Sequence, residues 1–168
     1  MTAPNKLLSV LIATAFITVL SVFPFLNLIN LLCCAGVVLG GFIGTSHYGR
    51  QLRNSNEEIN FKDGVAIGIL SGVVSALIVV IVSTLLSMML KQNPIPEIST
   101  MLEQYGFRMP PESEEILRRI SDEYNKNGFS ITLTIANLIF DLISYPVFSS
   151  IGGMLAVTMF RKRKSAQQ

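Results

Sequence analysis

The sequence is poor in charge for a chain of its length. Only 14% of its 168 residues are Asp, Glu, Lys or Arg, whereas 50% are hydrophobic, and the mean hydropathy is +0.53. A water-soluble domain of this size needs more charge on its surface. The composition therefore argues against an ordinary soluble domain and predicts that lipid covers part of the protein.

The sequence also lacks the residues that most catalytic and metal sites need. Its one histidine is His47, and its two cysteines, Cys33 and Cys34, are adjacent within an apolar run. Adjacent cysteines rarely form a disulfide, and His47 lies about 20 Å from them along one helix. No phosphate-binding loop, HExxH, GxSxG or dinucleotide fingerprint occurs. We therefore expect no metal, no cofactor and no enzyme activity.

Long apolar segments are the main feature that is present. No charged residue occurs from Leu7 to Tyr48, a stretch that suits two short membrane spans but is too long for one. Pro24 divides it, because proline interrupts helices. Two more apolar segments follow, and the last contains Asp141. The sequence predicts an all-α, four-transmembrane-helix bundle with spans at about 7–22, 26–47, 65–90 and 131–160.

The connection between the third and fourth spans, residues 91–130, is polar but patterned. Apolar residues recur at helical spacing from Ile98 to Tyr105, and again along one face of residues 112–127. Acids crowd the first turn of this second segment and Gly128 follows its end, as expected for a helix start and stop. The loop is therefore predicted to hold two short amphipathic helices.

Basic residues near the span ends predict the orientation of the chain. Eight of them flank the ends that a cytoplasmic N-terminus places inside, including the run from Arg161 to Lys164. The outer loop has five, and its seven acidic residues outnumber them. Both termini are therefore expected in the cytoplasm. Because the basic run directly follows an apolar segment, it indicates a membrane anchor, and we expect no nucleic-acid partner.

Glycine recurs twice at four-residue spacing, which places small residues along one face of a helix. Such faces let a neighbouring backbone approach closely in lipid. The spacing leaves open whether the neighbour belongs to the same chain or to another copy. The predicted helix-packing residues are Gly36, Gly40 and Gly44 in the second span, and Gly64, Gly68 and Gly72 in the third.

Asp141 is the only carboxylate inside a predicted span, and an ionisable group in a membrane is a candidate functional residue. With Asn27, Asn30 and Ser144 it would line a polar cavity that opens to the outside. The alternative is that Asp141 reaches the membrane interface, where a charge is well solvated.

Two segments resemble an uncharacterised family of small bacterial membrane proteins. The first runs from Pro24 to Cys34 and follows the pattern P-x-L-N-x-x-N-x-x-C-C, and the second runs from Asp63 to Gly72 and follows D-G-x-x-x-G-x-x-x-G. The resemblance implies a multi-pass protein of the bacterial inner membrane. It implies no chemistry, because no activity is known to us for that family.

Two interpretations of function stay open. A non-catalytic packing or assembly module explains the glycine faces and an interior expected to lack polar residues. Its partners would be the lipid bilayer and further copies of the chain or another membrane protein. A small transporter or channel is the alternative, and it would use the polar cavity near Asp141.

Overall fold

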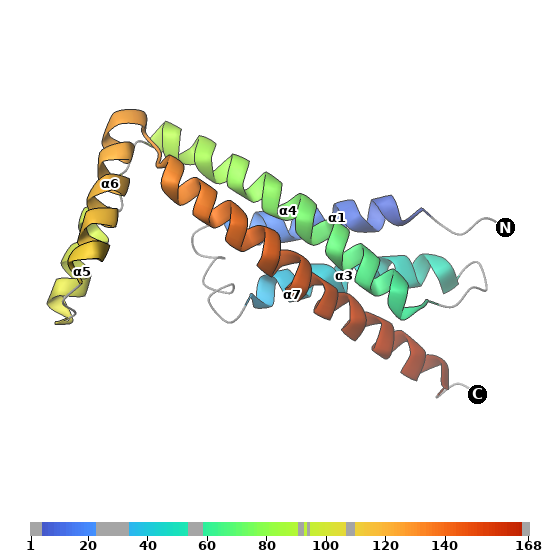
Figure 1. Ribbon diagram of the computed structural model, residues 1–168. Helices are drawn as coiled ribbons and strands as arrows, with labels where there is room; N and C mark the ends of the chain where they lie inside the picture. The colour runs from blue at the N-terminus through green and yellow to red at the C-terminus, as the bar shows by residue number, and fades with distance from the viewer. Residues whose placement is uncertain are drawn as a thin grey trace. The chain divides into compact units, whose positions relative to one another are not determined.

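The computed structural model describes residues 5–22, 34–53, 59–90, 93, 95–106 and 110–165. These residues form helices and no strand, so the predicted all-α class is confirmed. The helices are α1 (Lys6–Val22), α3 (Ala35–Arg53), α4 (Phe61–Leu90), α5 (Ile95–Gln104), α6 (Pro111–Asn127) and α7 (Ile131–Ser165), drawn in Figure 1.

Two of the described helices, rather than the four predicted, are long and apolar enough to cross a membrane. They are α4 and the Ile131–Arg161 part of α7. The helix α1 is apolar but shorter. The helix α3 carries polar and basic residues towards its end, and the predicted beginning of its span, from residue 26 to 33, lies outside the described residues. Length and composition together therefore separate α4 and α7 from the other described helices.

The helix α3 continues beyond residue 47, the predicted end of the second span, and reaches Arg53. Tyr48 and Leu52 in this extension are buried and belong to one apolar cluster with Ile67 and Val157. The added turns of helix therefore form because their apolar side chains pack on the neighbouring helices, although the local sequence is polar.

The helices α4 and α7 also exceed their predicted bounds. α4 begins at Phe61, where the Asp63 carboxylate accepts a hydrogen bond from the Asn60 amide at 3.0 Å, as the acidic residue of a capping box does, and the Asn60 carbonyl accepts from the Asp63 amide. α7 passes through Pro146 and continues to Ser165 as one helix. Both helices thus continue through the charged residues at these ends.

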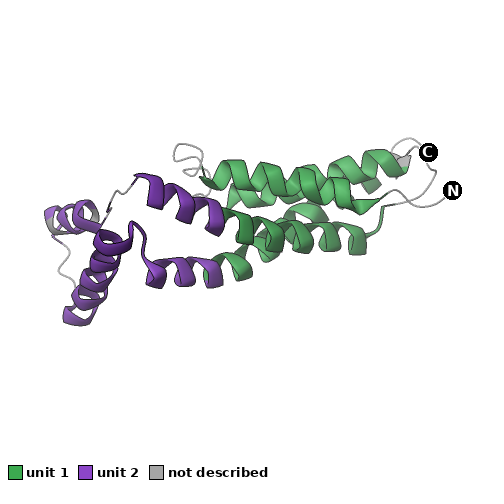
Figure 2. Ribbon diagram, turned by 90° about the horizontal axis from the view of Figure 1, so that it is seen from above, with its two compact units in different colours: residues 1–79, 140–168 green, residues 80–139 purple. Residues whose placement is uncertain are grey.

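The chain divides into two compact units, which Figure 2 shows in different colours. Unit 1 comprises residues 1–79 and 140–168, and unit 2 comprises residues 80–139. In unit 1, Gly44 near the end of α3 packs on Ser9 near the start of α1, and Arg161 near the end of α7 lies over the ring of Phe61 at the start of α4. The helices of unit 1 therefore alternate in direction along the chain.

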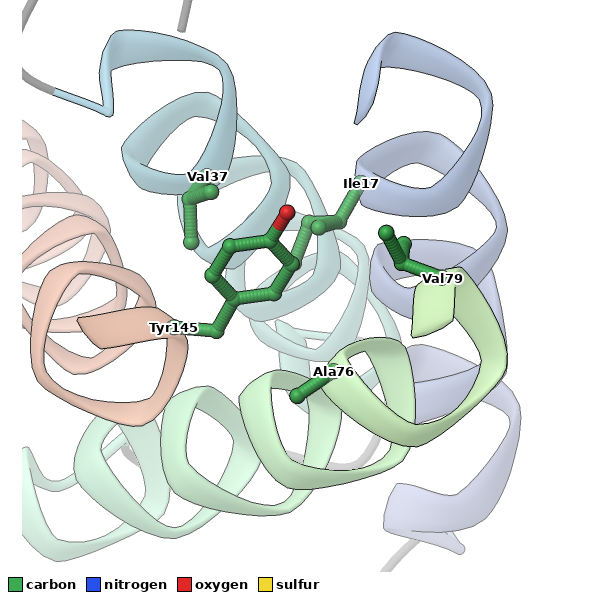
Figure 3. Packing of buried hydrophobic residues seen from close by; sticks show 5 residues of the cluster. All are labelled: Ile17, Val37, Ala76, Val79 and Tyr145. Carbon is green, nitrogen blue, oxygen red and sulfur yellow. The ribbon is translucent and has the colours of Figure 1, made fainter. Parts of the chain in front are cut away.

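A second apolar cluster in unit 1 takes one or two side chains from each of its four helices. Figure 3 shows Tyr145 of α7 reaching between Val37 of α3 and Ile17 of α1, beside Ala76 and Val79 of α4. In contrast, many large apolar side chains are exposed on the outside of this unit, among them Leu11, Leu39, Leu70, Ile78, Ile143 and Leu155.

Unit 2 contains the two loop helices, α5 and α6, which contact each other. Asn93 joins them by donating its side-chain amide to the Ser121 hydroxyl at 2.8 Å and to the Asn125 side-chain oxygen at 3.1 Å. α6 ends at Gly128, whose φ of 77° is left-handed and whose amide donates to the Tyr124 carbonyl. This is the helix stop that the sequence predicts.

Candidate functional site

The glycine face of α4 lies against α7. A Cβ atom added at Gly64 would stand 2.7 Å from the carbonyl oxygen of Gly153, closer than real side chains approach. The same construction at Gly68 and Gly72 meets the backbone of Ser150 and of Pro146. Only glycine allows these two helices to come so near, which is how small residues act at helix contacts in lipid.

The glycine face of α3 lies mainly against α1. Gly44 packs on the Ser9 carbonyl and on Ala13, and Gly40 packs on Ile17. Gly36 is buried near the start of the helix. The two predicted glycine sets therefore meet different helices, α1 and α7, and both contacts lie within one chain.

The interior of unit 1 is rich in buried hydroxyl groups, which corrects the expectation of an interior without polar residues. These side chains are small enough to fit beside the glycine faces. They come from all four helices of the unit: Ser9, Thr14 and Ser21 of α1, Thr45 of α3, Ser71 and Ser75 of α4, and Ser149 of α7.

Some of these hydroxyls bond between helices. The Ser71 and Ser149 oxygens are 3.0 Å apart, and Ser71 also reaches the Gly68 carbonyl at 3.1 Å. The Tyr145 hydroxyl donates to Ser21 at 3.0 Å. These bonds link α4 to α7 and α7 to α1 through the centre of the unit.

Other buried hydroxyl oxygens have no hydrogen-bond partner among the residues that the structure describes. They belong to Thr14, Thr18, Thr45 and Ser75. An unpaired buried hydroxyl is unfavourable by about 1–3 kcal/mol, so this cluster is the feature of the interior that most needs a chemical explanation.

The predicted cavity is only partly described. Asp141 and Ser144 are half-buried on α7, whereas Asn27 and Asn30 lie outside the described residues. Asp141 shares its helix face with Tyr145 and Ser149, because the three recur at four-residue spacing. The described neighbours of Asp141 on this face are therefore the interior hydroxyls.

One end of unit 1 gathers charged and aromatic groups. The Lys6 ammonium lies 2.7 Å from the Asp63 carboxylate and 5.8 Å from the centre of the Tyr48 ring. Nearby, Ser9 hydrogen-bonds to the His47 ring at 3.2 Å. Because Lys6 and Asp63 open α1 and α4 while Tyr48 and His47 stand near the end of α3, these helices bring their charged ends together.

In unit 2, Glu123 of α6 binds the beginning of α7. Its carboxylate accepts from the hydroxyls of Ser130 and Thr132 and from the Thr132 amide, at 2.6–2.9 Å. The Ser130 hydroxyl, followed by the bonds from Thr132, holds the pKa of Glu123 down at about 2. The carboxylate thus stays ionised and caps the Thr132 amide at this helix start.

The described residues contain no cluster of three or more His, Cys, Asp or Glu side chains that would hold a metal ion. The buried hydroxyls do not stand out in the sequence, because serine and threonine within apolar runs carry no charge. Their signal was spacing: residues 71 and 75, and residues 145 and 149, repeat every four positions. Comparison with protein families, with curated proteins and with solved structures finds no match to this chain.

Proposed function

We propose that the chain is a four-span protein of the bacterial inner membrane, in which α1, α3, α4 and α7 cross the bilayer and both termini are cytoplasmic. The observation that carries this proposal is the distribution of side-chain size in unit 1. Glycine and serine line the helix contacts, while large residues such as Leu70 and Leu155 are exposed. Lipid chains are a suitable surrounding for such a surface, and close backbone packing replaces the hydrophobic effect inside.

The charged end of unit 1 supports the orientation. Lys6, Asp63 and Arg161 stand near the ends of three different helices. Lys6 pairs with Asp63, and Arg161 lies over Phe61 two residues before Asp63, so the three helix ends meet. Basic groups concentrate on the cytoplasmic side of inner-membrane proteins, so this end faces the cytoplasm.

Within the membrane, we propose a non-catalytic role as a packing or assembly module. The glycine faces are used inside the chain, so they stabilise the module itself. A second copy or another membrane protein would therefore contact the outer faces of large apolar side chains. Chemical crosslinking in intact cells tests this role: a membrane protein captured in fixed proportion supports the module, and a chain recovered only as a monomer contradicts it.

A small transporter or channel is the second candidate, and the buried hydroxyls favour it. Helix packing alone does not require buried hydroxyl oxygens without hydrogen-bond partners, such as those of Thr45 and Ser75. Asp141 on the same face of α7 as Ser149 would give such a pathway a charged group.

Cysteine labelling tests the membrane placement. With Cys33 and Cys34 replaced by alanine, single cysteines at Lys62 and Asn125 are treated in intact cells with a thiol reagent that cannot cross the membrane. Both positions are exposed in the structure. We expect the cysteine at 125 to react and that at 62 to react only after the cells are opened. Labelling of both in intact cells would contradict the four-span arrangement.

A further inference from the structure

The unpartnered hydroxyls of α1 lie beside a hydrogen bond between helices. Thr14, Thr18 and Ser21 share one face of α1, since they are spaced by four and three residues. Ser21 accepts the hydroxyl proton of Tyr145. The two threonines therefore lie on the face of α1 that is directed towards α7.

The other two unpartnered hydroxyls extend the contact between Ser71 and Ser149. Ser75 is one turn beyond Ser71 on α4. Thr45 of α3 lies beside Gly153, which is one turn beyond Ser149 on α7. A Cβ atom added at Gly153 would stand 3.0 Å from the Thr45 oxygen. Each unpartnered hydroxyl is thus about one or two helical turns from a hydroxyl that bonds across the interior.

Water is the ligand that fits these groups. A buried water typically makes about three hydrogen bonds to polar groups that lack other partners, and hydroxyls can both donate to it and accept from it. A metal cation fits poorly, because a charge inside a membrane needs a carboxylate beside it. Among the described residues of unit 1, the carboxylates are Asp63, which pairs with Lys6, and Asp141, which lies two turns from Ser149.

We propose that the interior hydroxyls bind a file of water molecules, and that this file passes protons along the bundle between Asp141 and the end that holds His47 and Asp63. Each oxygen accepts a proton from one neighbour and releases its own to the next, so no bond to carbon changes and no oxidant or reductant is needed. The proposal rests on the membrane placement and goes beyond the role of a packing module.

Titratable and charged groups from every helix of the unit lie along or at the ends of this route. Asp141, Tyr145 and Cys34 stand at the end at which α7 enters the unit, and the remaining groups gather towards the opposite end. The described groups are Lys6 of α1, Cys34 directly before α3, His47, Tyr48 and Arg50 of α3, Lys62 and Asp63 of α4, and Asp141, Tyr145 and Arg161 of α7.

Proton flux into liposomes tests the proposal. The full chain is inserted into phosphatidylcholine liposomes that contain a pH-sensitive dye, and valinomycin with a potassium gradient makes the inside negative. We expect the wild-type protein to acidify the interior faster than the leak of empty liposomes. Thr45→Val and Ser75→Ala, which each remove one unpartnered hydroxyl, should lose this excess rate.

Thr158→Val is the matched control, because it makes the same change as Thr45→Val on an exposed hydroxyl that bonds to the Leu155 carbonyl of its own helix. It should keep the wild-type flux, and thermal unfolding checks that each variant is folded. Flux equal to that of empty liposomes, or unchanged flux in folded Thr45→Val and Ser75→Ala, overturns the proton path. A chain that alkaline carbonate extracts from the bilayer instead overturns the membrane placement.

Discussion

The hydroxyl oxygens of Ser71 and Ser149 lie 3.0 Å apart, although 78 residues separate them in the chain. Both side chains are completely buried, and each stands beside a glycine contact between α4 and α7. The close approach of the two backbones is what allows such short side chains to meet.

A double-mutant cycle on Ser71→Ala and Ser149→Ala measures this bond. Hydrogen bonds between membrane helices contribute about 0.6 kcal/mol on average, so we expect a coupling free energy of that order in reversible unfolding in detergent. Ser150→Ala serves as the control partner, because its hydroxyl bonds to the Val147 carbonyl of its own helix. Strictly additive effects of Ser71→Ala and Ser149→Ala would show that the contact contributes nothing.

Replacing Gly68 by leucine should destabilise unit 1 by at least about 1–3 kcal/mol, because the new side chain is forced into the backbone of Ser150. Thermal unfolding in detergent gives the difference. Ile69→Leu is the matched control, since Ile69 is 43% exposed and the exchange conserves volume. Equal melting temperatures for the two variants would refute the packing role of Gly68.

Replacing Asp63 by alanine should lower the free energy of unfolding more than replacing it by asparagine. Its carboxylate caps α4 through the Asn60 amide and pairs with Lys6. Asp63→Ala removes both contacts, and we expect a loss of about 1–2 kcal/mol in the free energy of unfolding. Asparagine keeps an acceptor for the cap and should lose less than 1 kcal/mol, the usual limit of an exposed ion pair. A loss as large with asparagine as with alanine would assign the whole effect to the ion pair.

The link between α6 and α7 should open in acid. The pKa of Glu123 is lowered from 4.5 to about 2. The carboxylate therefore stabilises the folded link fully above pH 4.5, and this stabilisation is lost as the pH falls towards 2. Hydrogen exchange of the Thr132 amide, corrected for its intrinsic rate, should speed up across that window in the wild-type protein.

Glu123→Gln separates the charge from the shape of the side chain. In this variant the Thr132 amide should exchange faster at neutral pH, with no further change between pH 4.5 and 2. Glu115→Gln on the exposed side of α6 should behave like the wild-type protein. A Glu123→Gln profile that still follows the wild-type pH dependence would mean that another group controls the link.

The apolar helices α4 and α7 could be predicted from composition, because each is a long run of mainly apolar residues. Their ends could not. The third span is predicted from residue 65, yet α4 starts at Phe61, where the Asp63 carboxylate accepts from the Asn60 amide. Tyr48 and Leu52 lie beyond the predicted end of the second span, yet they are buried because tertiary packing outweighs the polar local sequence.

The glycine faces could be predicted from spacing, but their partners could not, since spacing does not say which helix lies opposite. The interior hydroxyls were overlooked for a different reason. Within an apolar run only their four-residue spacing sets these residues apart, and the contact of Ser71 with Ser149 is what shows that they face the interior.

The concentration of glycine and serine at the helix contacts, with many large apolar side chains exposed outside, reverses the mutational tolerance expected of a soluble protein. Positions such as Leu70 and Ile78 accept most bulky apolar residues, whereas Gly64, Gly68 and Gly72 accept almost nothing larger. In a library of random variants selected for stable expression, the smallest side chains would be the least replaceable. Positions that accept no larger residue would then recur every fourth residue along α4. The substitution frequencies alone would show where α4 contacts α7.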